Sequence, residues 1–410
     1  TWGTGPGLIE PFVLRIRQAI EKGVVDFRPR HRVDELFTVG GRVAGVKGSI
    51  LEPSNVSRGE ASSRVEVGEF SFIGESVLVA SGGIGGNFDL IRENWPKRLG
   101  NPPGRLLSGV PNHVDGRMLK AAEKAGGRIV NRDRMWHYTE GIKNWNPIWP
   151  YHGIRILPGP SPLWFDAIGR RFEAPNFPGF DTLGTLKAIM DTGYDYSWFI
   201  LTEKIIEKEF ALSGSEQNPD LTEKSIKKVL SRLLPGPTPP VKAFMDKGED
   251  FIIADNLQKL VDGMNRLTGN GLIKFQEIEK QIKARDREID NKFTKDLQVT
   301  AMRGARFYLG DKLIRVAKPH KILDPRNGPL IAVRLNILSR KTLGGLQTNL
   351  SGQVLGMDGK PVPGLYAAGE VAGFGGGGIH GYRSLEGTFL GNCIFNGLQA
   401  AEGILEELGK

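Results

Sequence analysis

The stretch that decides the fold reads PGLYAAGEVA over residues 363–372, and a glycine loop and the start of a helix follow it over residues 373–391. Its apolar residues predict a short strand that ends beside the carboxylate of Glu370. Such a carboxylate can accept hydrogen bonds from the hydroxyls of a bound nucleotide, and the free amides of a helix N-terminus stabilise negative charge. The order of strand, carboxylate, glycine loop and helix therefore predicts a nucleotide site.

A second glycine turn lies earlier in the chain. The sequence SVLVASGGIGGN over residues 76–87 predicts a buried strand that runs straight into a glycine-rich turn. Open α/β sheets bind ligands at the carboxyl ends of their strands, where glycines let the backbone approach a ligand closely. A plain tight turn explains this segment equally well when it is taken alone, so its value lies in its combination with residues 363–391.

The residues around these two segments indicate a domain that is interrupted and then resumed. A helix with apolar residues at helical spacing is expected to end at Lys22 and Gly23. Short β-rich runs follow it at residues 24–27, 32–37, 42–51, 65–72 and 76–80. Strands and glycine turns return after residue 331, and a last helix is expected over residues 387–408.

The intervening residues 91–324 have a different character, aromatic and irregular at first and then helical and charged. Helices are expected over residues 256–267 and 275–288, and the prolines of residues 235–240 predict a stiff linker. We therefore expect an α/β fold: a Rossmann-like domain that is interrupted by an α+β insertion.

Composition narrows the classes of function. The 410 residues include 55 Lys and Arg and 46 Asp and Glu, which gives a net charge of +9. The basic residues are scattered along the sequence rather than clustered. We see no nucleic-acid-binding signature, and an anionic cofactor explains the excess of positive charge more simply.

Cys393 is the only cysteine, so no disulfide framework or multi-cysteine metal site is expected. We predict a cytoplasmic protein, because no apolar run approaches the ~20 residues of a membrane span and residues 1–7 lack signal-peptide features.

These two glycine segments, together with TLGGL at residues 342–346, resemble an FAD-dependent oxidoreductase family. It comprises fumarate reductase and succinate dehydrogenase flavoproteins and ketosteroid dehydrogenases, and the most similar subgroup is known only as FAD-binding dehydrogenases. The resemblance extends from about Val24 to the end of the chain. It implies FAD as the cofactor, an FAD-binding domain formed by residues 1–90 and 326–410, and a capping substrate domain formed by residues 91–325.

The resemblance also implies roles for particular residues. The glycine and carboxylate after the last short strand hold FAD, the following helix gives amides to the flavin, the first glycine turn lies by the cofactor, and one strand residue meets the adenine. In this chain these positions are Gly369 and Glu370; Leu385, Phe389 and Leu390; Ala80, Ser81, Gly82 and Gly83; and Val33.

One family feature has no counterpart at the start of the chain. Members open with a strand, a G-x-G-x-x-G turn and a helix whose N-terminus holds the pyrophosphate. Residues 1–7 contain glycines, but no apolar strand precedes them, and Pro6 lacks an amide hydrogen. We expect an N-terminally truncated FAD domain: a fragment, a short product whose missing half is another chain, or a chain that no longer binds FAD.

The expected substrate contacts depart from the family pattern. Arg340 stands where fumarate reductases carry a histidine, and arginine can grip an anion with a bidentate fork. Arg383 comes one position early in the His-Gly-x-x-Arg stretch, after His380 and Tyr382. We expect Arg340, Arg383 and His380 to orient or polarise a substrate carbonyl, with Tyr382 and Tyr138 as candidate acids or bases.

The function expected from the resemblance is oxidation or reduction of a carbon–carbon bond beside a carbonyl or carboxylate, with hydride passing to or from flavin N5. Fumarate is not expected as the substrate, because the proton-donating arginine of fumarate reductases has no match after residues 169–172. The aromatic residues within 134–152 indicate either a lid over a ring-shaped substrate or the core of a small domain.

Two other hypotheses stay open: a flavin-free remnant with a structural role, and an electron-transfer subunit whose partner supplies the phosphate loop. A small-molecule substrate is expected, with either a homo-oligomer or a partner chain.

Overall fold

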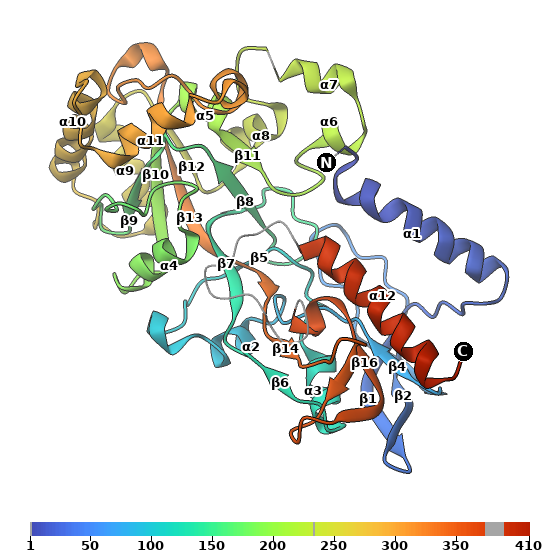
Figure 1. Cartoon of the computed structure of the whole chain (residues 1–410). Coiled ribbons are helices and arrows are strands. Elements are labelled where there is room, and N and C mark those ends of the chain that lie inside the picture. The colour runs from blue at the N-terminus through green and yellow to red at the C-terminus, as the bar shows by residue number, and fades with distance from the viewer. Residues whose placement is uncertain (1, 233, 374–388) are drawn as a thin grey trace.

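The computed structural model describes residues 2–232, 234–373 and 389–410. Figure 1 shows two parts, with the large sheet and most helices in the upper part and the smaller sheets in the lower part. Helix α12 (Phe389–Glu407) runs along the lower part, and α1 (Thr4–Glu21) projects beside it. No helix in the described part of the chain has both the length and the apolar character needed to cross a membrane.

Two three-stranded sheets form the lower part. An antiparallel meander contains β1 (His31–Val39), β2 (Arg42–Leu51) and β3 (Glu66–Ile73) in that order. The other sheet has the order β15 (Gln353–Leu355), β16 (Pro361–Ala367) and β4 (Val77–Val79). Within it β16 and β4 run parallel although nearly 300 residues separate them in sequence, so the chain returns to its first domain after a long excursion.

The excursion builds an eight-stranded sheet around β13 (Leu330–Thr342), the longest strand. Its partners are β5 (Leu107–Ser108), β7 (Met135–Lys143), β8 (Gly153–Pro158), β9 (Leu163–Asp166), β10 (Tyr196–Thr202), β11 (Phe210–Leu212) and β12 (Phe251–Ala254). The first nine residues of β13 form an almost continuous apolar run, LIAVRLNIL, which is the pattern of a strand covered on both faces. Accordingly, Leu330 to Leu338 are all buried.

Helices lie in both parts, where they connect the strands and cover the sheets (Figure 1). They are α2 (Phe88–Glu93), α3 (Arg117–Lys124), α4 (Thr182–Met190), α5 (Glu203–Glu209), α6 (Pro219–Thr222), α7 (Ile226–Ser231), α8 (Pro239–Lys247), α9 (Leu257–Thr268), α10 (Phe275–Asp290) and α11 (Leu297–Ala305). A short pair, β6 (Ile129–Val130) with β14 (Gly345–Leu346), and the one-turn 3-10 helix η4 (Gly369–Val371) lie in the lower part.

Most elements expected from the sequence are present, and the structure is mixed α/β. The expected helices over 256–267 and 275–288 correspond to α9 and α10. The expectation of a β-run at residues 24–27 is wrong: these residues form no strand, and Val24 and Phe27 are exposed, so they have no sheet in which to be buried. The domain limits 1–90, 91–325 and 326–410 stay a prediction.

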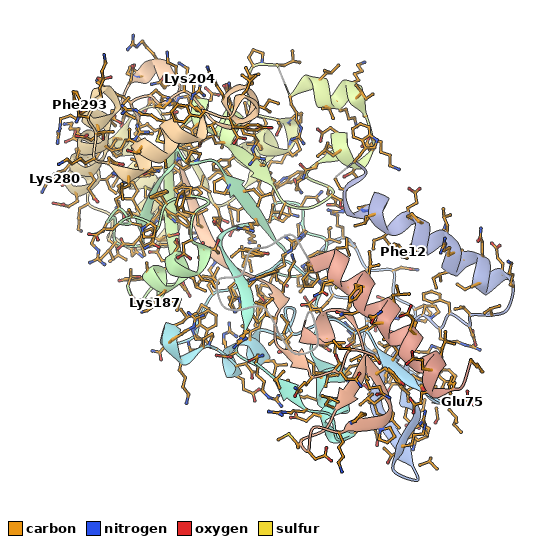
Figure 2. The ribbon with its side chains drawn as sticks, viewed as in Figure 1. Phe12, Glu75, Lys187, Lys204, Lys280 and Phe293 are labelled. Carbon is orange, nitrogen blue, oxygen red and sulfur yellow. The ribbon has the colours of Figure 1, made fainter. Side chains whose placement is uncertain are left out.

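Helix α1 is unusual because it contains no buried residue although it is rich in apolar ones. It is tied to the rest of the chain near its N-terminus: Gly3 N donates to Leu221 O at 2.8 Å, Thr4 Oγ1 lies 2.8 Å from Thr222 Oγ1, and Lys224 Nζ lies 3.3 Å from Glu10 Oε2. Figure 2 shows Phe12 on this helix, well away from Phe293, in the turn after α10, and from Lys280 on α10. Apart from this contact near α6, the structure therefore leaves the apolar side chains of a long helix unburied by the described residues.

Candidate functional site

The two glycine-rich segments meet at one edge of a sheet. In the parallel pair formed by β4 and β16, Ala367 lies opposite Val79, so the turns that follow both strands leave from the same edge. A Cβ on Gly83 would lie 2.7 Å from Glu370 Oε1 and 2.0 Å from Thr342 Oγ1. Only glycine fits there, and the first glycine turn lies directly against the carboxylate.

Thr342, the last residue of β13, joins these two segments. Its amide donates a hydrogen bond to Glu370 Oε1 at 2.8 Å, and its hydroxyl oxygen accepts one from Ile84 N at 2.9 Å. The insertion's central strand therefore ends in a pair of hydrogen bonds that fix the glycine turn and the carboxylate relative to each other.

Glu370 is set to change its protonation state near neutral pH. Burial raises the pKa of its carboxyl to about 7, although the hydrogen bonds from Thr342 and the positive charges of Lys341 and Arg340 act in the opposite direction. When it is ionised, its oxygens have lone pairs left for further donors, and when it is protonated it can itself donate. This donor and acceptor capacity suits the hydroxyls of a flavin's ribityl chain.

A cleft of about 240 Å³ contains two more of the expected cofactor residues, Val33 and Ser81. Its other lining residues are Arg32, Arg64, His113, Asp115, Gly116, Arg117 and Met118. Three arginines thus line one cleft, and guanidinium groups suit the phosphate groups of a dinucleotide, although Arg32 also pairs with Glu66 and Arg117 with Asp115. One carboxylate, Asp34, holds two of them: Arg32 Nε lies 2.8 Å and Arg117 Nη1 2.6 Å from Asp34 Oδ1.

The surroundings of Glu370 and the arginine-lined cleft together fit the chemistry of FAD. Glu370 offers oxygens that accept hydrogen bonds from hydroxyl groups, and the cleft offers cations for phosphates. The turn from Ser81 to Gly83 connects the two. Gly82 and Gly369 have positive φ angles of 77° and 74°, so both turns need the freedom of glycine at these points.

The start of α12 lies near the same edge. The Nζ atom of Lys341 lies 4.6 Å from the ring centroid of Phe389 and 5.3 Å from that of Trp136. Phe389 is the first residue of α12, and Leu390 follows it. The expected contribution of their amides to a flavin stays a prediction.

The expected substrate residues lie in different surroundings. Arg340 lines a second cavity of about 240 Å³ together with Trp149 and His152. Tyr138 lies on β7 and is buried, with the guanidinium carbon of Arg155 3.9 Å from its ring centroid. His380, Tyr382, Arg383 and Leu385 lie outside the described residues.

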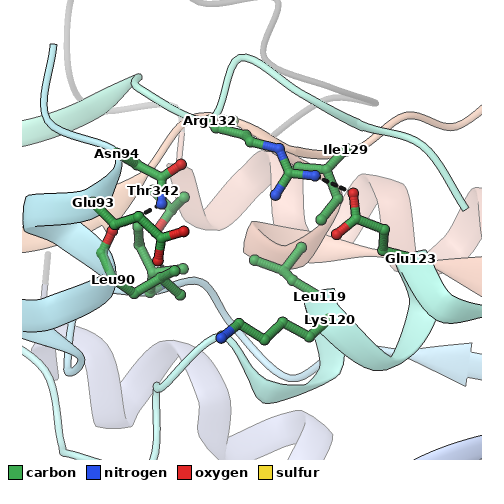
Figure 3. Close-up of a pocket in the computed structure, with 13 residues that line it drawn as sticks. Leu90, Glu93, Asn94, Leu119, Lys120, Glu123, Ile129, Arg132 and Thr342 are labelled. Carbon is green, nitrogen blue, oxygen red and sulfur yellow. Dashed lines mark hydrogen bonds and ion pairs between the residues drawn. The ribbon is translucent and has the colours of Figure 1, made fainter. Parts of the chain in front are cut away.

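A third cavity, of about 140 Å³, adjoins Thr342 and Ile84 (Figure 3). Leu119 and Ile129 form part of its apolar wall, and an ion pair between Arg132 and Glu123 lies at its rim.

Sequence reasoning missed several residues of these sites. Thr342 was visible as the first residue of the TLGGL segment, but its hydrogen bonds to Glu370 and Ile84 depend on contacts distant in sequence. His152 was only one member of an aromatic cluster. Arg32 and Arg117 gave no signal, because scattered basic residues are common on protein surfaces.

Comparison with known proteins places the chain among flavoproteins. A family model described as "FAD binding domain" matches residues 1–390. A KsdD-like steroid dehydrogenase of Mycobacterium tuberculosis is 58% identical over 409 residues, which cover 100% of this chain and 72% of that protein. A KsdD-like steroid dehydrogenase of Mycolicibacterium smegmatis is 60% identical over 390 residues, which cover 95% of this chain and 71% of that protein.

Among solved structures, a 3-ketosteroid delta1-dehydrogenase from Sterolibacterium denitrificans, in complex with 1,4-androstadiene-3,17-dione, superposes with a TM-score of 0.62. The match covers 95% of this chain and 62% of that chain at 18% identity. At this identity the likeness is one of fold alone, and this chain spans less than two thirds of that structure.

The contact between Gly83, Thr342 and Glu370 predicts the effect of one methyl group. Gly83→Ala should lower the free energy of unfolding by about 1–3 kcal/mol, because the added carbon overlaps Thr342 Oγ1 and forces the turn away from Glu370. Urea denaturation measures the change. Gly271→Ala is the matched control, since its added carbon meets nothing within 4 Å, and it should stay within about 0.5 kcal/mol of the wild type. Equal effects of the two substitutions would contradict the tight packing at Gly83.

The raised pKa of Glu370 predicts a pH-dependent change in stability. Between the ordinary value of 4.5 and about 7 the folded chain binds more protons at this carboxyl than the unfolded chain, so its stabilising contribution is lost as the pH rises through this window. Glu370→Gln keeps an acceptor for Thr342 N and does not titrate. Relative to the wild type, it should gain about 1–2 kcal/mol of unfolding free energy between about pH 5.5 and pH 8.

Urea unfolding of both proteins at the two pH values checks this difference. The control is Glu216→Gln, because the hydrogen bond from Arg58 lowers the pKa of Glu216 and places its titration below this range. A Glu370→Gln difference that is the same at both pH values would show that the carboxyl titrates normally.

Proposed function

Because the chain belongs to the FAD binding domain family, we propose that it forms the catalytic part of a flavin-dependent dehydrogenase that adds or removes two hydrogens across a carbon–carbon bond beside a ketone. The proposed substrate class is the ketosteroids. Support comes from the two relatives named KsdD-like steroid dehydrogenases, which are 58% and 60% identical to this chain. The observation that carries the proposal is the contact of Glu370 and Thr342 with the glycine turn at Gly83.

Several expectations from the sequence are confirmed by the family match. The resemblance to the fumarate reductase and ketosteroid dehydrogenase flavoproteins, the Rossmann-like FAD-binding fold, FAD as the cofactor and the class of flavin-dependent dehydrogenases all agree with it. The roles of individual residues, the oligomeric state and the cytoplasmic location stay proposals.

We propose that FAD lies along the edge from Val33 to Glu370. The carboxyl of Glu370 would accept hydrogen bonds from the ribityl hydroxyls, and the guanidinium groups beside Ser81 would offset the phosphate charge. Amides of Phe389 and Leu390 would face the flavin ring. When it is bound, FAD supplies the two-electron redox chemistry that the protein's own side chains lack.

The chain's own contribution to the reaction is to orient and polarise the carbonyl. Arg340 is the best placed of the described candidates, because it lines a cavity that also touches apolar side chains. Polarising the carbonyl makes the neighbouring C–H bonds more acidic, which is the requirement for proton removal beside a ketone. His380, Tyr382, Arg383 and Tyr138 remain candidates for holding the carbonyl or moving the proton.

Binding and turnover together test the proposal. The purified chain with added FAD should keep flavin absorbance near about 450 nm through gel filtration and should melt at a higher temperature than without FAD. With androst-4-ene-3,17-dione as the substrate and dichlorophenolindophenol as the electron acceptor, the dye should bleach as the steroid loses two hydrogens. Arg340→Met should lower kcat/KM by about 10- to 100-fold while flavin absorbance is retained.

Failure of both flavin binding and turnover would favour the flavin-free structural alternative. That alternative has less support, because the charged cleft and the carboxyl of Glu370 retain the chemistry of a cofactor site.

Exposed apolar side chains on α1, α12 and β4 favour the hypothesis that a further polypeptide segment binds here. Six apolar side chains on α1, four on α12 and one on β4 are exposed: Leu8, Ile9, Phe12, Val13, Leu14 and Ile16; Ile394, Phe395, Leu398 and Leu405; and Leu78. Among the described strands β4 pairs only with β16, so its other edge is open. Parallel sheets are ordinarily covered on both faces, and exposed apolar surface of this extent marks an interaction site.

We propose that a polypeptide segment with a strand and a glycine-rich phosphate loop covers this surface and adds its strand beside β4. The part of the Mycobacterium tuberculosis relative that lies outside its match to this chain is the natural test segment. Co-expressed with this chain, that segment should co-elute with it and increase flavin retention.

Phe12→Glu should weaken this complex at least about tenfold, because a carboxylate on α1 would have to be buried in the interface. Phe293→Glu is the control: Phe293 is 90% exposed and lies on the far part of the molecule (Figure 2), so it should leave the complex intact. A homodimer of this chain alone, measured by light scattering and broken by Phe12→Glu, would instead assign this surface to a second copy.

A further inference from the structure

The cavity that contains Arg340 is built differently from the cofactor cleft. It lies where β13 passes the connection between β7 and β8, and its walls are mainly apolar. The apolar wall residues are Ile148, Trp149, Ile154 and Leu338. The polar residues include His152, Arg340 and several of residues 213–217. A hydrocarbon ring with one polar end matches such a lining.

His152 presents a fixed hydrogen-bond donor in this cavity. Its Nδ1 atom lies 3.1 Å from the backbone nitrogen of Ile148 and 3.1 Å from Asn144 Nδ2. A backbone N–H can only donate, so Nδ1 accepts and the neutral ring must carry its proton on Nε2. No described residue hydrogen-bonds to Nε2, although His152 is only 6% exposed.

The ring of His152 is also held in place and kept neutral. Its centroid lies 3.9 Å from that of Trp149, whose own Nε1 donates to Ser108 O at 3.2 Å. Burial lowers the pKa of His152 to about 4, and the charge of Arg340 acts in the same direction. The imidazole therefore offers one N–H, in one orientation, without a charge of its own.

Arg340 owes its position to an irregularity in β13. Ser339 pairs with His137 and Lys341 pairs with Trp136, the next residue of β7, so Arg340 is the extra residue of a β-bulge. A bulge redirects a side chain out of the strand's normal alternation. The side chain passes over Gly109, where an added Cβ would lie 3.1 Å from Arg340 Cγ, and its guanidinium has no ion-pair partner among the described residues.

We propose that this cavity binds a ketone oxygen of the substrate, which accepts hydrogen bonds from His152 Nε2 and from the guanidinium of Arg340 while the attached ring packs against Trp149. This inference rests on the proposed function and extends it by naming His152 as a substrate-binding residue and a ketone as the group that is recognised. Glu216 leaves Arg340 available, because its own carboxylate is paired with Arg58. The apolar walls favour a neutral ketone on a ring over a freely hydrated anion.

The test uses binding to the full chain and needs no turnover. Androst-4-ene-3,17-dione is titrated into protein labelled with ¹⁵N at its six histidines, and the Nε2 resonance of His152 is followed. It should shift on binding, while the resonance of His31 should not, because His31 lies on the β1 meander away from this cavity. His152→Phe, which keeps the aromatic ring beside Trp149, and Arg340→Met should each raise the Kd by about tenfold or more.

Matched ligands locate the recognised oxygen. The two monoketones that lack either the 3- or the 17-oxygen are compared, and His152→Phe should weaken only the one that retains the recognised carbonyl. Failure of the steroid to bind, or binding without a shift at His152, overturns the inference, as does equal weakening of both monoketones. A shift produced by cyclohexanecarboxylate but not by either monoketone also overturns it, because the cavity would then be an anion site.

The two proposals fail in different ways. If the steroid is turned over and the His152 resonance does not change, the dehydrogenase proposal stands and the proposed ketone site at His152 is wrong. A specific shift without turnover supports the ketone site and removes the assigned reaction.

Discussion

The pair of hydrogen bonds made by Thr342 is the constraint on which the rest of the site depends. Its amide holds Glu370 and its hydroxyl holds the amide of Ile84, so one residue of the insertion's central strand fixes both turns of the nucleotide-type domain. Gly83 makes this arrangement possible, since any side chain there would occupy the space of the threonine hydroxyl. Without this contact the carboxyl and the glycine turn would lie on adjacent strands but would have no fixed relation to each other.

The same strand carries the second cavity, so in the proposed enzyme one strand would hold the cofactor and substrate groups in register. Over five residues β13 places Leu338 and Arg340 in the cavity wall and Thr342 on Glu370. A rigid strand that is paired along its length moves little, so the separation between the two places is set by backbone geometry. The bulge at Arg340 is one of two irregularities in the pairing of β13 with β7, and it turns a basic side chain into a cavity whose other walls are largely apolar.

The sequence was sufficient where chemistry follows from local order. Strand ends with glycines and a carboxylate predicted that Glu370 and residues 80–83 share an edge, because neighbouring parallel strands end on the same side of a sheet. It was insufficient where a role depends on distant contacts. The acceptor role of His152 Nδ1 depends on the fold of residues 144–152, and the bulge that directs Arg340 depends on register with β7. Residues 24–27 failed as a strand for the same kind of reason, since apolar residues form a strand only where a partner exists.

The electrostatics around Arg340 support a ketone as the proposed ligand. The positive charge of Arg340 lowers the pKa of both Glu370 and His152, so it acts on the carboxyl beside the glycine turn and on the imidazole in the cavity. Burial raises the pKa of Glu370 and lowers the pKa of His152. Near neutral pH, Glu370 is therefore only partly ionised and His152 is neutral. The guanidinium is therefore a charge that the described residues compensate only weakly. A ketone oxygen carries a partial negative charge that grows when a proton leaves the neighbouring carbon. A fixed cation therefore stabilises the transition state of proton removal more than it stabilises the bound ketone. A carboxylate would already hold its full charge in the ground state, so the same cation would strengthen its binding without favouring the reaction.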